Sequence, residues 1–524
     1  LDLFHAALNS KLDEVKTILQ SGVDPNFTTN KDGATALYIA AQLGHKEIVS
    51  LLISAKANIH ETLKKDGSTP LIIAAQNGHK DIVSLLISAG ANLNHTMTIG
   101  ATALLAAAQY GHKDIVWLLL SAGADPNLAL TDGSTALYLA AQIGHKDIVL
   151  LLISAKANVD QTNTDGSTPL LIATQSNNKD IVSLLISAGA NSNITMDDGI
   201  SPLYIAAQND LKDIASLLIS AGANLNKAMP DGMTPLFIAA QNGCKDIVSL
   251  LISAGANVNP AMTVIKLGAT PLYAAAQNGY GDMVSLLVSA GTNLDQATTD
   301  NVTPLFIASQ TGNKNIASLL VSAGANVNLS MTSGATPLRV AAQNGLEDIA
   351  SLLISSGANL NQPMNDGSTP LFSAAQHGHK NIVVQLLSAG ANIDQALTTA
   401  ATPIRVAAQQ GHTEIVSLLA SAGANVNQAM DGGSTPLIIA TKNGHQDIVS
   451  ILIAAHADVN IATNTGESPL HTAASLGHTF IISLLLQANA EAGLKNSDGL
   501  TPLMLATHNN YKEAVRLLSS QASR

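Results

Sequence analysis

The segment DGMTPLFIAAQNGCKDIVSLLISAGANVN, residues 231–259, determines the fold. Its first two residues, Asp-Gly, are a turn signal, because glycine adopts positive φ without strain. Thr234 and Pro235 favour a helix start, as an N-cap and a first helical residue, and Gly243 favours its end. Aliphatic residues at helical spacing then predict a second helix that ends before Gly255. The segment therefore predicts two short helices joined by a tight turn.

The same pattern recurs along the whole chain. Its anchor is a Thr or Ser followed by Pro or Ala and then Leu or Ile, at steps of 33 residues with one step of 34 and one of 36. The anchors are Thr35, Thr69, Thr102, Thr135, Thr168, Ser201, Thr234, Thr270, Thr303, Thr336, Thr369, Thr402, Thr435, Ser468 and Thr501. Neither helix of a single repeat can bury its apolar side alone, so the repeats must stack.

We therefore predict an all-α repeat solenoid in which stacked helix-turn-helix units are joined by β-hairpin-like fingers. Residues 1–524 are expected to form a single array, with residues 1–29 as an N-terminal capping repeat, 30–495 as internal repeats and 496–524 as a C-terminal capping repeat. Sixteen layers spaced like packed helices would give a rod on the order of 130–160 Å long. No unit has a reason to fold back on a distant one, so we expect a monomer.

The unit resembles the ankyrin repeat. The family pattern matches GESPLHTAA at residues 466–474 and GHKDIVSLL at residues 78–86, and the resemblance covers the whole chain. It implies a concave groove, lined by fingers and first-helix ends, that usually binds partner proteins. The histidine that the family places after the leucine is kept only at His471, so the hydrogen bond made there is in doubt in the other units.

Composition excludes several classes of function. The net charge is −12, from 37 acidic and 25 basic residues, and no basic run offsets it, so nucleic acid is not an expected partner. The single cysteine, Cys244, excludes an internal disulfide and suits a reducing compartment. Polar residues interrupt every apolar run before the roughly 20 residues of a membrane span, and the first residues do not form a signal peptide. We expect the cytosol or nucleoplasm, or a host cytosol for a secreted effector.

No pattern in the sequence predicts catalysis. Eight histidines share one template position, but equivalent residues in adjacent layers lie roughly 8–10 Å apart, too far to share a metal held about 2 Å from each nitrogen. They are His45, His79, His112, His145, His379, His412, His445 and His478. We interpret them as part of a Gly-His turn, and Cys244 as a tolerated replacement. Phosphate loops, carboxylate pairs and triads are absent from the sequence, so we predict no catalytic, cofactor or metal site and no enzyme activity.

Deviations from the template are the best indicators of a partner site, because packing does not require them. Near the N-terminus, Leu43, Tyr110 and Ile143 occupy a first-helix position that is usually small or polar, and Trp117 and Leu150 interrupt a ladder of serines on the second helix. Trp and Tyr are favoured interface anchors. Isolated surface apolar residues are equally common on proteins with no partner there, so both interpretations stay open.

The finger tips provide further candidates. Seven of the ten methionines share one finger position, among them Met229, Met331 and Met364. Methionine suits adaptable recognition, and packing between successive fingers explains it equally well. A three-residue insertion lengthens one finger and is expected to expose Val264, Ile265 and Lys266.

The predicted function is a protein–protein interaction scaffold that binds partner proteins of unknown identity through the groove and the fingers. One alternative is an elastic or architectural spacer, which the near-identical units and few aromatic residues favour. Another is the recruiting arm of a larger effector whose catalytic domain lies outside this sequence. The chain starts at Leu1 rather than at a methionine, which is consistent with a piece of a longer protein.

Overall fold

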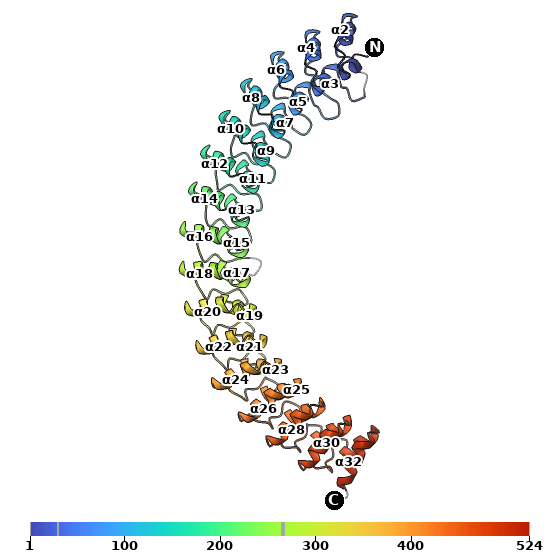
Figure 1. Cartoon of the computed structure of the whole chain (residues 1–524), viewed down its shortest axis with the longest axis vertical. Helices are drawn as coiled ribbons and strands as arrows, with labels where there is room; N and C mark the ends of the chain where they lie inside the picture. The colour runs from blue at the N-terminus through green and yellow to red at the C-terminus, as the bar shows by residue number, and fades with distance from the viewer. Residues whose placement is uncertain (1, 29–30, 264–267, 523–524) are drawn as a thin grey trace. The chain divides into compact units, whose positions relative to one another are not determined.

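The structure, a computed structural model, describes residues 2–28, 31–263 and 268–522. In these ranges the regular secondary structure is α-helical, apart from one isolated antiparallel bridge between Ala129 and Thr135. The chain consists of two compact units, unit 1 (Leu1–Pro260) and unit 2 (Ala261–Arg524). Within each unit, helix pairs stack in chain order, the odd-numbered first helices on one side and the even-numbered second helices on the other (Figure 1).

Each repeat contributes one first and one second helix. The helices of unit 1 are α1 (Leu3–Leu8), α2 (Leu12–Gln20), α3 (Ala36–Leu43), α4 (Lys46–Ser54), α5 (Pro70–Gln76), α6 (Lys80–Ser88), α7 (Ala103–Gln109), α8 (Lys113–Ser121), α9 (Ala136–Ile143), α10 (Lys146–Ser154), α11 (Pro169–Gln175), α12 (Lys179–Ser187), α13 (Pro202–Gln208), α14 (Lys212–Ser220), α15 (Pro235–Asn242) and α16 (Lys245–Ser253). Those of unit 2 are α17 (Pro271–Asn278), α18 (Gly281–Ser289), α19 (Pro304–Thr311), α20 (Lys314–Ser322), α21 (Pro337–Asn344), α22 (Glu347–Ser355), α23 (Pro370–His377), α24 (Lys380–Ser388), α25 (Pro403–Gln410), α26 (Thr413–Ser421), α27 (Pro436–Lys442), α28 (Gln446–Ala454), α29 (Pro469–Leu476), α30 (Thr479–Gln487), α31 (Pro502–His508) and α32 (Lys512–Ala522).

The first helices begin and end where their local residues predict. In α5 the Thr69 hydroxyl accepts a hydrogen bond from the Ile72 N–H at 3.3 Å, and Pro70 occupies the first helical position. Helix α15 ends before Gly243, whose φ of 86° is in the left-handed region. These caps satisfy backbone groups that a helix of seven or eight residues would otherwise expose.

The core lies between the two helix layers. Leu37 of the first helix and Ile48 and Leu52 of the second are essentially inaccessible to solvent, as are Ala40 and Ala41. The two alanines let neighbouring first helices approach closely, while the aliphatic side chains fill the space between first and second helices. Each helix pair therefore buries its apolar surface against its own partner and against the next repeat.

The Gly-His turn joins consecutive repeats. The Nε2 atom of His79 lies 3.0 Å from the carbonyl oxygen of Gln42 in the preceding repeat, so its N–H donates to that oxygen. A Cβ added to Gly44 would lie 2.7 Å from the same imidazole ring. The glycine of one repeat thus makes room for the histidine of the next, which confirms the structural interpretation of these histidines. Equivalent bonds of 2.9–3.4 Å are made by His112, His379, His412 and His445.

Over the residues that the structure describes, the predicted hairpin-like fingers are tight turns rather than paired strands. Within one finger the Met97 N–H donates to the Ala101 carbonyl at 2.9 Å and the Gly100 N–H donates to the Met97 carbonyl at 2.8 Å. Thr98 then donates its N–H to the Asp66 carbonyl of the preceding finger at 2.9 Å. These few bonds close each turn and link it to its neighbour, but they are too few to form strands.

Asparagine and aspartate side chains form a second connection between repeats. The Asn158 N–H donates to Asn127 Oδ1 at 2.7 Å, and the Asn191 N–H donates to Asp160 Oδ1 at 2.8 Å. In unit 2 the Asn359 N–H donates in the same way to Asn328 Oδ1. Each of these bonds satisfies a loop N–H with the side chain of the preceding repeat, so the loops hold the layers in register.

A ladder of salt bridges joins the second helices. The lysine that begins one second helix pairs with the acidic residue in the first turn of the next, at 2.7–3.0 Å, and all of these side chains are exposed. The pairs are Lys46–Asp81, Lys80–Asp114, Lys113–Asp147, Lys146–Asp180, Lys179–Asp213, Lys212–Asp246, Lys314–Asp348 and Lys380–Glu414. Where Glu347 replaces the lysine, Asn381 replaces the acid and donates to Glu347 Oε1 at 2.8 Å. These exposed charges therefore form an ordered contact between successive repeats.

This ladder predicts a pH-dependent stability. Hydrogen bonds from lysine hold the pKa values of Asp147, Asp180 and Asp213 below their usual range. Because these folded-state pKa values lie below the unfolded ones, the stabilisation is present above about pH 4 and is lost as the pH falls through the folded-state values. We expect the triple variant K113Q/K146Q/K179Q to have a lower melting temperature than the wild type at neutral pH. The difference should disappear in acid and in about 1 M salt, and a gap that does not change with pH would contradict this assignment.

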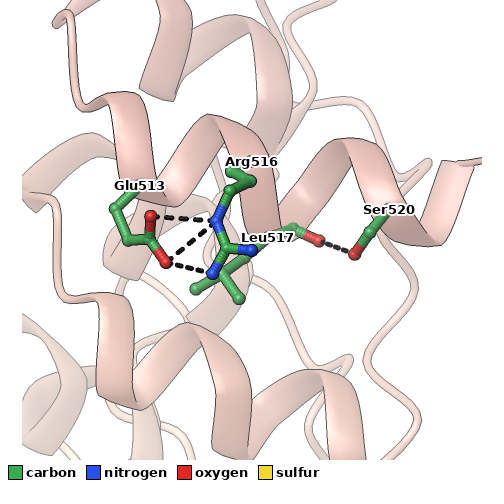
Figure 2. A network of polar contacts seen from close by, with 4 residues as sticks. All are labelled: Glu513, Arg516, Leu517 and Ser520. Carbon is green, nitrogen blue, oxygen red and sulfur yellow. Dashed lines mark hydrogen bonds and ion pairs between the residues drawn. The ribbon is translucent and has the colours of Figure 1, made fainter.

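The last helix, α32, carries exposed charge. Figure 2 shows Arg516 facing Glu513, with its Nε 3.0 Å from Glu513 Oε2, and the Ser520 hydroxyl donating to the Leu517 carbonyl at 2.7 Å. Arg516 occupies the position that serine holds in most other second helices. This charge fits the predicted role of a C-terminal capping repeat, which stays a prediction.

Candidate partner-binding surface

Three large apolar side chains form an exposed set on the first helices of unit 1, termed here the first-helix patch. Leu43 ends α3, Tyr110 follows α7 and Ile143 ends α9; they are 44%, 54% and 49% exposed. Because α7 packs directly against α9, Tyr110 and Ile143 lie on adjacent layers. At the same position in α5's repeat, Asn77 donates its Nδ2–H to the Gln42 carbonyl at 2.9 Å, so the template itself requires only a polar residue.

The Tyr110 ring is held in a defined orientation. It stacks on His112, with ring centroids 6.4 Å apart and an interplanar angle of 17°. The Gln76 amide nitrogen lies 3.5 Å from the Tyr110 hydroxyl, at the limit of a hydrogen bond. A side chain that is already oriented loses little conformational entropy when a partner contacts it, which makes Tyr110 the strongest anchor candidate of the patch.

The second helices carry a separate set, the second-helix patch. Trp117 on α8 and Leu150 on α10 are 54% and 40% exposed, and the two helices are in contact. The salt bridge from Lys113 to Asp147 joins the same two helices at 2.8 Å. Trp117 and Leu150 thus lie on neighbouring second helices, and Tyr110 and Ile143 lie at the ends of neighbouring first helices. The two patches are therefore on different sides of the stack of helix pairs in unit 1.

The finger methionines take part in packing. Met331 and Met364 contact a small apolar cluster formed by Phe306, Ala335 and Val340 in unit 2. This contact favours the second of the two interpretations left open for them, packing between fingers.

Other finger candidates are described less fully. Met229 is half-buried, and its N–H donates to the Met233 carbonyl at 2.9 Å, so it helps to close its own finger turn. The candidates Val264, Ile265 and Lys266 of the long finger lie outside the described residues.

The single cysteine, Cys244, is buried. Burial, followed by the nearby Asp210 carboxylate, raises the pKa of the Cys244 thiol to about 11, so the thiol stays protonated at neutral pH and is a poor nucleophile. In the described ranges no group of three or more His, Cys, Asp or Glu side chains is arranged to hold a metal ion. No described helix combines the length and the apolar character that a membrane span requires.

One cleft in unit 1 contains two histidines. It has a volume of about 230 Å³ and is lined by Ile59, His60, Thr69, Leu71, Ala91, Asn92 and His95. The His95 Nε2 lies 2.9 Å from the Gly67 carbonyl oxygen, so its N–H is engaged with a finger turn. We assign this cleft to the junction between successive fingers.

The first helices of unit 2 also carry basic side chains that the sequence predictions did not include, termed here the cationic strip. It consists of Arg339 on α21, Arg405 on α25 and Lys442 on α27. Both arginines occupy a position that is aromatic or aliphatic in most repeats, and this deviation was the available signal.

The family comparison agrees with this architecture. A family model described as ankyrin repeats (3 copies) matches residues 3–97, 57–129, 104–196, 186–262, 260–331, 327–396, 382–463 and 452–523. These matches cover almost the whole sequence, and the chain belongs to the ankyrin repeat family. Members of this family are generally protein–protein interaction modules and are typically non-catalytic. No curated protein matches the chain.

Proposed function

We propose that residues 1–524 act as one protein-interaction scaffold, with capping repeats at residues 1–29 and 496–524. Its partners are proteins, bound along the first-helix side and the fingers, and the scaffold acts as a monomer in the cytosol or nucleoplasm without a cofactor. The observation that carries this proposal is the first-helix patch, where Tyr110 and Ile143 expose large apolar surfaces on adjacent layers. Tyrosine and large apolar side chains that are exposed in this way are typical interface anchors.

The array provides its own control substitutions for this proposal. Asparagine occupies the Tyr110 position in several repeats, including at Asn77, Asn209 and Asn242. The double variant Y110N/I143N therefore replaces both anchors by a residue that the same fold already accommodates. We expect its melting temperature to match that of the wild type.

The test is affinity capture with the intact chain, in which proteins retained by the wild type and by Y110N/I143N are quantified. We expect the variant to lose a defined subset of partners, each anchor contributing about 1–2 kcal/mol to binding. The affinity of one purified partner for both forms then checks this value. If the variant retains the same proteins with unchanged affinity, the first-helix patch is not the partner site.

The second-helix patch is a second candidate surface, because Trp117 is the most exposed aromatic anchor on the second helices of unit 1. The matched substitution is W117S/L150S, since serine occupies this position at Ser84 and Ser183. We expect it to weaken binding of a partner that spans the second helices by about 1–2 kcal/mol per anchor. Unchanged binding in both double variants would favour the alternatives, an architectural spacer or the recruiting arm of a larger effector.

A further inference from the structure

The cationic strip is confined to four consecutive first helices of unit 2. Among the first helices, lysine or arginine occurs only at Arg339, Arg405 and Lys442, and His377 lies on the helix between the two arginines. None of α21, α23, α25 and α27 contains an acidic residue. In a chain of net charge −12, this is a local concentration of positive charge on the side where the family binds partners.

Arg405 is buried without a carboxylate. It is only 8% exposed, and its Nη1 donates to the neutral Gln409 amide oxygen at 3.2 Å. Its Nε is buried and has no hydrogen-bond partner, and burial lowers the pKa of the guanidinium. A buried charge with a weak neutral acceptor is an unfavourable arrangement, so Arg405 can gain a stronger partner than it has.

Arg339, two repeats earlier, is held similarly: its Nη1 donates to the Gln343 amide oxygen at 2.6 Å, and its Nε is buried without a hydrogen-bond partner. Burial lowers its pKa, but the negative charge of Asp366 in the following finger acts against this effect. The equivalent position after Arg405 is Gly432. Arg405 thus lacks the acidic neighbour that Arg339 has.

Other buried hydroxyl groups in these repeats are also unpaired. The hydroxyl oxygens of Thr402, Ser373 and Thr441 are buried and have no hydrogen-bond partner. They belong to the cap of α25 and to the two flanking first helices, α23 and α27. In the preceding repeat the Thr369 hydroxyl accepts from the Phe372 N–H at 3.2 Å, whereas Thr402 makes no such cap bond. Buried polar atoms are rarely left unpaired, but Thr402, Ser373 and Thr441 have no exposed surface, so Arg405, which is 8% exposed, is the group that a ligand can reach.

We propose that the cationic strip binds an extended acidic segment of a partner protein, with one carboxylate on Arg405 and a second on Arg339. This deepens the proposed scaffold function and rests on it. The first carboxylate replaces the Gln409 amide as acceptor, because a guanidinium forms stronger, two-pronged hydrogen bonds with a carboxylate. Two repeat layers span about 16–20 Å, which an extended segment covers in about five or six residues.

The test uses a random-peptide display library selected against the intact chain and, in parallel, against Arg405→Tyr. Tyrosine is the residue at this position in four other repeats, at Tyr38, Tyr138, Tyr204 and Tyr273, so the fold should tolerate it. We expect the wild type to enrich peptides with two acidic residues about five or six positions apart. We expect Arg405→Tyr not to enrich them, and its melting temperature to be at least that of the wild type.

A synthetic enriched peptide then gives the affinity. Replacing its critical Glu by Gln, or Arg405 by Tyr, should each weaken binding by about 10- to 100-fold, and the two changes together should cost little more than either alone. Arg405→Lys should retain part of the affinity, because it keeps the charge but not the planar donor pair.

Three outcomes would overturn this inference. The first is enrichment of non-acidic peptides equally by both forms, which leaves the scaffold proposal intact. The second is the absence of any enriched peptide, in which case the capture experiment with Y110N/I143N decides the scaffold proposal separately. The third is binding of a labelled uridine oligonucleotide at physiological salt that depends on Arg405, which would assign the strip to nucleic acid.

Discussion

Replacing Leu152 by alanine is expected to lower the local free energy of unfolding around α10 by about 2–5 kcal/mol. Leu152 is completely buried, and α10 packs against α8, α9 and α12. The truncation removes apolar contacts and leaves a cavity that the stacked helices can only partly close. Hydrogen exchange of the α8–α12 amides, compared with that of unit 2, measures this local loss.

The control is in the same helix. Leu150→Ala makes the same chemical change at a side chain that is 40% exposed, and we expect its effect on stability to be within about 0.5 kcal/mol. Equal losses for Leu150 and Leu152 would contradict the assignment of the two faces of α10.

The second large effect is expected at a finger turn. Gly100 has a φ of 82°, and a Cβ added there would lie 2.7 Å from the Ala129 carbonyl oxygen and 2.9 Å from Leu130 Cα in the next finger. Gly100→Ala therefore combines left-handed strain of about 1–2 kcal/mol with an overpacking cost of about 1–3 kcal/mol. We expect the fingers on both sides to separate, which hydrogen exchange at the Thr131 N–H would detect.

Gly123→Ala separates the two contributions. Gly123 has a φ of 95°, but no atom lies within 4 Å of the position that its Cβ would take. This variant should show only the strain, so its loss of stability should be the smaller of the two. If Gly123→Ala costs as much as Gly100→Ala, the contact between fingers contributes nothing to stability.

The sequence predicted best what depends on neighbouring residues along the chain. Helix starts such as Thr69-Pro70 and the stop at Gly243 follow from the backbone preferences of those residues, and the 33-residue period follows from their spacing. The repeat fold was therefore predictable, except that the described parts of the fingers are turns without strands.

Contacts between repeats were harder to predict. The Lys113–Asp147 pair and the Asn127–Asn158 bond join residues that are 34 and 31 positions apart. Predicting these contacts from the sequence requires knowing how each repeat is rotated relative to the next. For the same reason the exposure of Tyr110 could be anticipated from its deviation, but the unpaired Nε of Arg405 could not. Its pairing depends on side chains that only the folded structure brings near it.

The fixed offsets between repeats also bear on how such a chain can change its length. Each histidine, asparagine and lysine described above forms a hydrogen bond or an ion pair with a residue of the preceding or the following repeat. The partner residue occupies a fixed position of the same repeat pattern. A duplicated or deleted block of 33 residues would keep these partner positions aligned at the new junction. A block of another size would shift them out of alignment.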